Sequence, residues 1–154
     1  IMALHPRIMN LWNQARYRQV AYLLKIGLLT LLGIFVLIIL PAQIFNQTIF
    51  KMLQWIIPDI SLKFKPLVMP LIIAGFFWQL SFLTHKMLEL EERTMMMVFF
   101  ILVSLLINIV GNFVFIPRIG VLATAYTAAT SAVVYCLLTT TFSVNSLIKR
   151  KYKQ

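Results

Sequence analysis

The stretch MMMVFFILVSLLINIVGNFVFI, residues 95–116, contains no charged side chain. It is slightly longer than the roughly 20 apolar residues that an α-helix needs to cross a hydrocarbon core about 30 Å thick. The stretch VLATAYTAATSAVVYCLLTTTFSV, residues 121–144, is also uncharged but richer in the small and hydroxyl residues that suit close helix contacts. Between them, Pro117 has no N–H to donate and Gly120 turns readily, so both favour a helix end. We therefore predict a transmembrane hairpin.

The composition extends this interpretation to the whole chain. Of its 154 residues, 61% are apolar and 12% are charged, whereas charged residues alone make up about a quarter of an ordinary soluble domain. We therefore predict an all-α integral membrane bundle of about four transmembrane helices, with interfacial helices in addition. The net charge of +10 comes from lysines and arginines beside the apolar stretches rather than from one basic patch, so we expect no nucleic-acid partner.

The rest of the sequence gives the expected order of segments. Two further apolar stretches cover residues 20–41 and 67–84, and we expect Pro41 to end the first of them. Residues 1–19 and 42–66, which flank the first of these stretches, show helical apolar spacing with basic or polar residues opposite. This pattern is typical of interfacial helices. The expected order is an interfacial helix at 1–19, a span at 20–41, an external connector with an amphipathic helix at 42–66, a span at 67–84, a cytoplasmic loop at 85–94, a span at 95–116, an external turn at 117–120, a span at 121–144 and a basic tail at 145–154.

The distribution of basic residues predicts the orientation. Four spans place both ends of this segment on the same side of the membrane. Ten of the 14 lysines and arginines lie on that side, and the other four are Lys51, Lys63, Lys65 and Arg118. Because lysine and arginine accumulate in cytoplasmic loops, we predict that both ends are cytoplasmic.

The sequence contains no arrangement that indicates catalysis. The acidic residues and histidines all fall in predicted connectors; they are His5, Asp59, His85, Glu89, Glu91 and Glu92. Their spacing matches no metal-ligand set, and the chain has neither a glycine-rich phosphate loop nor a nucleophile with an evident base. We therefore expect no enzymatic activity, no metal and no cofactor.

Uncharged polar residues mark the third span. Ser104, Asn108 and Asn112 are four residues apart, so their side chains follow one slowly drifting stripe of the helix. An amide at membrane depth is costly unless it meets a partner or water. Two interpretations remain open. The asparagines tie the helix to its neighbours, at about 0.6 to 2 kcal/mol each, or they face a hydrated cavity and bind a hydroxyl-rich substrate.

Two other spans carry further candidates. On the fourth span, small residues recur every fourth position and predict a tight helix contact; they are Gly120, Thr124, Ala128 and Ala132. Polar residues elsewhere around this helix are candidates for lining a cavity: Tyr126, Thr127, Ser131 and Tyr135. On the second span, Trp78 and Gln79 are similar candidates, because an aromatic ring stacks on a sugar face, although a tryptophan in a membrane helix also serves for packing or anchoring.

The run NIVGNFVFIPRIGVLATAYTAATS, from Asn108 to Ser131, resembles a signature of bacterial polysaccharide flippases. In that signature two asparagines with three residues between them precede Ile-Pro, a glycine and an alanine-rich helix with a serine. These flippases belong to the superfamily of multidrug and oligosaccharidyl-lipid exporters. The segment from His85 to Thr94 resembles the family's cytoplasmic loop between spans. The segment HPRIM, which begins at His5, resembles its proline-containing lead-in to a basic surface helix.

The resemblance implies a role in transport. Such proteins have two bundles with a dozen or so spans, and this chain resembles the C-terminal region. The whole protein would flip a polyprenyl-diphosphate-linked oligosaccharide across the bacterial inner (plasma) membrane by alternating access, in polysaccharide and lipopolysaccharide (O-antigen) biosynthesis. Its expected partners are the lipid bilayer and the lipid-linked oligosaccharide. Two alternatives are a multidrug exporter of the same fold and a non-transport membrane subunit that assembles through its small-residue face.

Overall fold

The computed structural model describes residues 5–57 and 59–151, and this part of the chain is all-α. The first half contains α1 (His5–Asn13), α2 (Tyr17–Ile44) and α3 (Asn46–Ile56). The second half contains a short 3-10 helix η2 (Leu62–Leu67), α4 (Val68–Thr84), α5 (Lys86–Leu90), α6 (Thr94–Ile119) and α7 (Leu122–Lys151). Four helical segments are long and apolar enough to cross a membrane: Tyr17–Ile44, Leu62–Leu90, Thr94–Ile119 and Leu122–Lys149. The predicted all-α bundle with about four spanning helices is confirmed.

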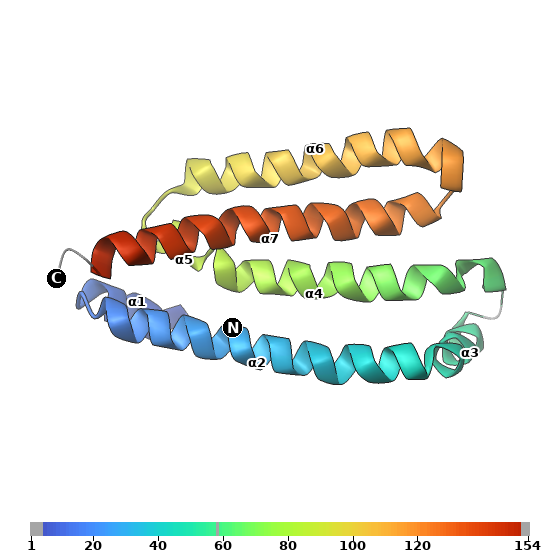
Figure 1. The fold of residues 1–154 in the computed structure, drawn as a ribbon, viewed down its shortest axis with the longest axis horizontal. Coiled ribbons are helices and arrows are strands. Elements are labelled where there is room, and N and C mark those ends of the chain that lie inside the picture. Colours follow the sequence, from blue (N-terminus) through green and yellow to red (C-terminus); the bar gives the residue numbers. More distant parts are fainter. Residues whose placement is uncertain (1–4, 58, 152–154) are drawn as a thin grey trace.

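The four long helices lie side by side in the order α6, α7, α4, α2 (Figure 1). Helix α7 is central, and it packs along both α4 and α6. Its alanines allow this close approach, since Ala123 and Ala125 are buried. Helix α6 approaches α7 closely at Gly111, where an added Cβ would lie 2.6 Å from Cγ2 of Thr127.

The outer helices direct large apolar side chains away from their neighbours. Leu37 of α2 is 75% exposed and Phe113 of α6 is 85% exposed. Of the residues of α6, all of which the structure describes, only Ser104 is buried. In a soluble protein such surfaces would be unfavourable, but lipid tails are as apolar as these side chains.

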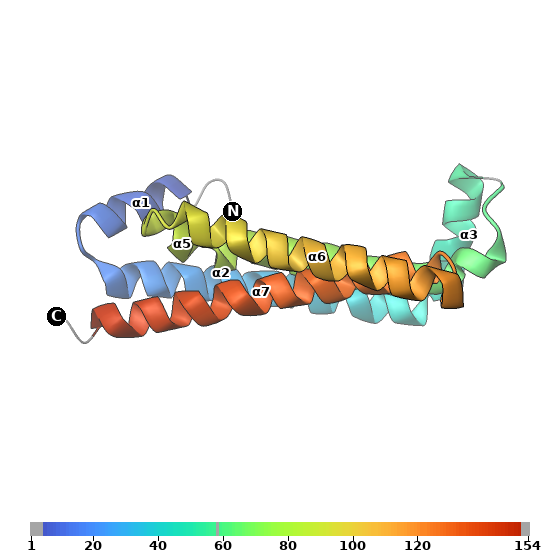
Figure 2. The same cartoon turned by 90° about the horizontal axis from the view of Figure 1, so that it is seen from above.

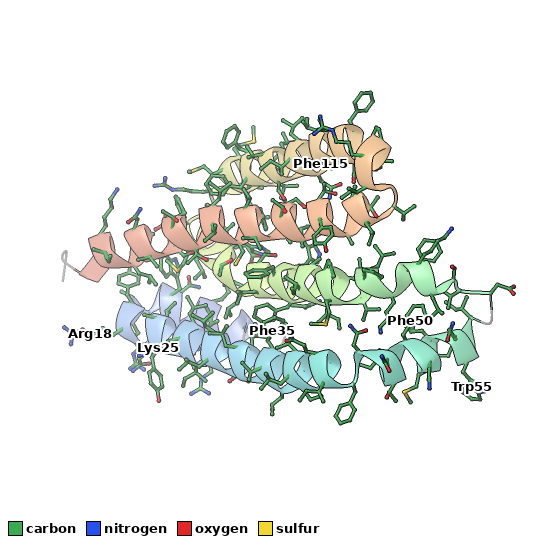
Figure 3. The ribbon with its side chains drawn as sticks, turned by 45° about the vertical axis from the view of Figure 1, so that its right-hand side comes forward. Arg18, Lys25, Phe35, Phe50, Trp55 and Phe115 are labelled. Carbon is green, nitrogen blue, oxygen red and sulfur yellow. The ribbon has the colours of Figure 1, made fainter. Side chains whose placement is uncertain are left out.

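The short helices α1 and α3 lie at opposite ends of the long ones and project to the same side (Figure 2). Helix α1 folds back along the start of α2, and its Ile8 is buried in a cluster with Val20 of α2 and Met87 of α5. Its Ile8 is therefore covered by protein, and its position along the membrane surface stays a prediction. Helix α3 crosses the direction of α2, and its Trp55 points outward at the tip (Figure 3).

The structure differs from the sequence analysis at two prolines. Helix α2 continues past Pro41 to Ile44, and α6 continues past Pro117 to Ile119. Each proline lies in the last turns of its helix, where the missing N–H removes one bond and the following turn still closes. The amide of Gly120 donates to the carbonyl of Ile116 at 2.8 Å. The helix then ends at Gly120, whose φ of 65° favours glycine.

Two predicted connectors are more helical than expected. The predicted loop at 85–94 contains α5, and α7 continues through residues 145–151 of the predicted tail. The predicted amphipathic helix in the 42–66 connector is present as α3. Residues 1–4 of the predicted lead-in and 152–154 of the predicted tail lie outside the described residues. The cytoplasmic and external assignments stay predictions.

Candidate functional site

A chain of polar contacts connects α6 to α7. Ser104 Oγ donates to the backbone carbonyl of Ser131 at 2.7 Å, and Asn108 Nδ2 donates to Ser131 Oγ at 3.4 Å. Further along the same interface, Asn112 Nδ2 donates to Asn108 Oδ1 at 3.0 Å, and Thr127 Oγ1 donates to Asn112 Oδ1 at 2.7 Å. Both asparagines therefore help to tie the two helices together, which was one of the two interpretations that the sequence left open.

The register of the hairpin brings these residues into contact. The polar residues of α6 are spaced by four, as are Thr127 and Ser131 on α7, so each set follows one stripe of its helix. The two helices run in opposite directions, so Asn112 meets Thr127 and Ser104 meets Ser131. The close approach at Gly111 puts the two stripes within hydrogen-bond distance.

A pocket of about 230 Å³ opens beside this interface. Helix α4 contributes Trp78, α6 contributes Ser104 and Asn108, and α7 contributes Ser131 and Tyr135. The apolar residues Ile101 and Leu105 of α6 complete the lining. These side chains come from the middle portions of the three helices, so the pocket lies near the centre of the apolar layer that they would span.

The pocket lining combines aromatic rings with polar groups. The ring centroids of Trp78 and Tyr135 are 6.1 Å apart; Trp78 is 48% exposed and Tyr135 is 2% exposed. The bond from Asn108 to Ser131 uses one of the two hydrogens of the Asn108 amide group, so a second donor is present. Hydroxyl oxygens of Ser104 and Ser131 also retain capacity to accept. The lining contains no ionisable acid or base other than the phenol of Tyr135. This arrangement suits a neutral ligand with hydroxyl groups and an apolar face.

The other predicted substrate-path residues lie elsewhere. Asn112 and Thr127 bond to each other further along the α6–α7 interface. Gln79 and Tyr126 are exposed and do not line the pocket. The structure therefore brings Trp78, Ser104 and Asn108 together in one pocket. Ser131 and Tyr135, which the sequence analysis named as candidates for lining a cavity, line the same pocket.

The predicted small-residue stripe on α7 is buried only toward its C-terminal end. Ala132 is buried, Thr124 and Ala128 are half-buried, and Gly120 is exposed. The adjacent stripe is buried throughout and carries a hydroxyl group every fourth residue: Thr127, Ser131, Tyr135, Thr139 and Ser143. Thr139 Oγ1 lies 2.7 Å from Thr84 Oγ1, and Ser143 Oγ donates to the carbonyl of Thr84. The regular spacing of these hydroxyls was the signal that the sequence analysis missed.

An ionic cluster fastens α5 to the bundle. His85 Nε2 lies 3.0 Å from Glu89 Oε1, while His85 Nδ1 lies 3.4 Å from the hydroxyl of Tyr135. Lys86, which is buried, forms an ion pair with Glu89. The predicted connector between the second and third spans is thus packed against α7 through polar contacts.

A second ion pair in this region, between Glu91 and Arg93, contacts the C-terminal part of α7. Glu91 Oε2 lies 3.3 Å from Arg93 Nε, and Ser146 Oγ donates to Glu91 Oε1. The Arg93 guanidinium also lies over the ring of Phe142, 5.3 Å from its centroid. Among the described residues, no group of three or more His, Cys, Asp and Glu side chains could hold a metal ion.

The four long apolar helices, their exposed apolar faces and their internally bonded polar groups define a multi-pass α-helical membrane protein. Comparison with known proteins found no matching family model, no matching curated protein and no matching solved structure.

Proposed function

We propose that this chain forms part of a membrane transporter whose substrate path includes the pocket of Trp78, Ser104, Asn108, Ser131 and Tyr135. The observation that carries the proposal is the presence of aromatic rings together with amide and hydroxyl groups in one pocket midway along apolar helices. Buried polar groups at membrane depth are costly, and those that face a cavity mark substrate paths in many transporters.

The substrate class follows from the chemistry of the lining. A sugar presents hydroxyl groups that exchange hydrogen bonds with amides and hydroxyls, and its C–H faces pack on aromatic rings. The pocket has no lysine or arginine to neutralise a diphosphate. Within a polyprenyl-diphosphate-linked oligosaccharide, the pocket would therefore bind the oligosaccharide, and the diphosphate would be neutralised elsewhere in the protein.

The resemblance of the run from Asn108 to Ser131 to bacterial polysaccharide flippases supports the same substrate. On this proposal the protein acts in the bacterial inner membrane with both ends of this segment in the cytoplasm. It moves the lipid-linked oligosaccharide by alternating access, for polysaccharide or lipopolysaccharide synthesis. The row of helices forms one wall of the path, and further helices of the second bundle form the other.

Binding of a lipid-linked oligosaccharide to the native protein tests the proposal. Loss of one aromatic contact, at about 0.5–1.5 kcal/mol, predicts that Trp78→Ala weakens binding roughly 2- to 10-fold. Asn108→Leu removes the amide donor and should weaken binding at least as much. The matched controls are Trp55→Ala, on the exposed tip of α3, and Asn145→Leu, on the exposed side of α7, which should both bind as the wild type does.

The pocket variants decide the outcome. If Trp78→Ala and Asn108→Leu bind the oligosaccharide normally, the pocket is not part of its path. If the wild type binds lipophilic cations but not the oligosaccharide, and the two substitutions weaken the binding of those cations, the protein is a multidrug exporter instead.

A further inference from the structure

A second crevice, about 200 Å³ in volume, lies between α2, α4 and α7. It is separate from the polar pocket and shares no residue with it. Leu24 and Leu28 of α2, Leu83 of α4, and Val144 and Leu147 of α7 give it mainly apolar walls. Its hydroxyl groups include those of Ser143, which donates to the backbone carbonyl of Thr84, and of Thr84, which bonds to Thr139, so both offer little to a polar ligand.

The one ionisable side chain in the crevice lining is Lys25. Arg18 lies seven residues earlier on α2, which is two turns and about 10 Å along the same helix face. Both side chains are exposed, and both lie on α2 toward the end of the bundle that carries α1 (Figure 3). The two cations therefore line up from the helix end to the apolar crevice.

Arg18 and Lys25 form no ion pair with an acidic residue in the part of the chain that the structure describes. At this end of the bundle, Glu89 pairs with Lys86 and His85, and Glu91 pairs with Arg93. No carboxylate of residues 5–57 and 59–151 forms an ion pair with Arg18 or Lys25. Two positive charges on one helix face, one of them in the lining of an apolar crevice, are complementary to a ligand that has an anionic head and an apolar tail.

We propose that this crevice binds one anionic glycerophospholipid, with part of an acyl chain between α2, α4 and α7 and the phosphate at Lys25 and Arg18. The volume is below the roughly 300–1,000 Å³ of pockets that enclose whole small molecules, so the crevice holds a chain segment. A long lysine side chain extends from an apolar helix to the headgroup level while its methylene groups stay in apolar surroundings. Bound in this way, the lipid fills the crevice between the three helices. The site does not depend on the transport function proposed above.

The test is lipid retention by the purified chain in detergent, measured by native mass spectrometry with added phosphatidylglycerol or phosphatidylcholine. The wild type should retain one phosphatidylglycerol per chain in preference to phosphatidylcholine. One cation near a membrane surface contributes about 1 kcal/mol, or about fivefold in affinity. Lys25→Gln and Arg18→Gln should therefore each weaken phosphatidylglycerol retention about fivefold.

Two other variants separate the site from general surface charge. Ala21→Leu adds bulk to the crevice lining without changing any charge, and it should also reduce phosphatidylglycerol retention. Lys51→Gln removes the same charge from the exposed surface of α3, at the opposite end of the bundle, and should leave retention unchanged. Equal retention of the two lipids overturns the proposal. Wild-type retention in Lys25→Gln, or an equal loss in Lys51→Gln, overturns it as well.

Discussion

Replacing Gly111 with alanine tests the close packing that creates the α6–α7 interface. A Cβ at this position would lie 2.6 Å from Cγ2 of Thr127 and 3.3 Å from its Cβ. Such contacts force the helices or the threonine to shift, and overpacking of this kind costs about 1–3 kcal/mol. The shift also disturbs the Thr127 Oγ1 bond to Asn112.

Comparison with Gly33→Ala isolates the cost of overpacking in the free energy of unfolding. Both changes give the helix a better helix former, worth up to about 1 kcal/mol. A Cβ at Gly33 meets nothing within 4 Å, so only the Gly111 variant suffers overpacking. We therefore expect Gly111→Ala to be less stable than Gly33→Ala by about 1–3 kcal/mol. The free energy of unfolding in detergent micelles or bicelles measures this difference.

A double variant identifies the clashing atom. Thr127→Ser removes Cγ2 but keeps the hydroxyl that bonds to Asn112. In a double-mutant cycle, Thr127→Ser should recover about 1 kcal/mol or more of the stability lost in Gly111→Ala. If Gly111→Ala is as stable as Gly33→Ala, or Thr127→Ser brings no recovery, the two helices are not as close as the structure places them.

Two further changes probe other contacts. Ser104→Ala removes the 2.7 Å hydrogen bond from α6 to the backbone of α7 and should lower the free energy of unfolding by about 0.6–1.7 kcal/mol; no loss would mean that the bond is absent in the membrane. Ile8→Ala removes a side chain that is 1% exposed and should weaken the docking of α1 by about 2–4 kcal/mol, seen as faster hydrogen exchange in α1. Ile38→Ala, at a 52% exposed site on α2, is its control, and equal effects of the two changes would place α1 away from the bundle.

The main helices could be predicted because their signals are local. A charge-free stretch of spanning length is apolar in any arrangement, so residues 95–116 and 121–144 indicated helices without knowledge of their neighbours. The spacing of Ser104, Asn108 and Asn112 likewise placed them on one stripe. The pocket beside this stripe could not be predicted, because Trp78 and Tyr135 come from helices whose positions depend on packing.

The missed features depend on contacts between distant segments. Adjacent stripes of α7 differ by about 100° around the helix, and the sequence alone does not say which of them meets α4 and α6. The small-residue pattern pointed to the stripe of Ala128, while the structure buries the hydroxyl stripe that contains Ser131 and Thr139. The apolar face of α1 has the same pattern whether lipid or protein covers it. For the same reason Ile8 did not reveal its contact with α5.

Photo-crosslinking with a lipid-linked oligosaccharide that carries a photoreactive group on its sugar tests the proposed function most directly. In the native protein, the sugar should label the residues that line the polar pocket, chiefly Trp78, Ser104 and Asn108, and unlabelled oligosaccharide-lipid should compete with the labelling. Labelling confined to the exposed apolar faces of α2 and α6, unaffected by the competitor, would contradict a substrate path through this pocket.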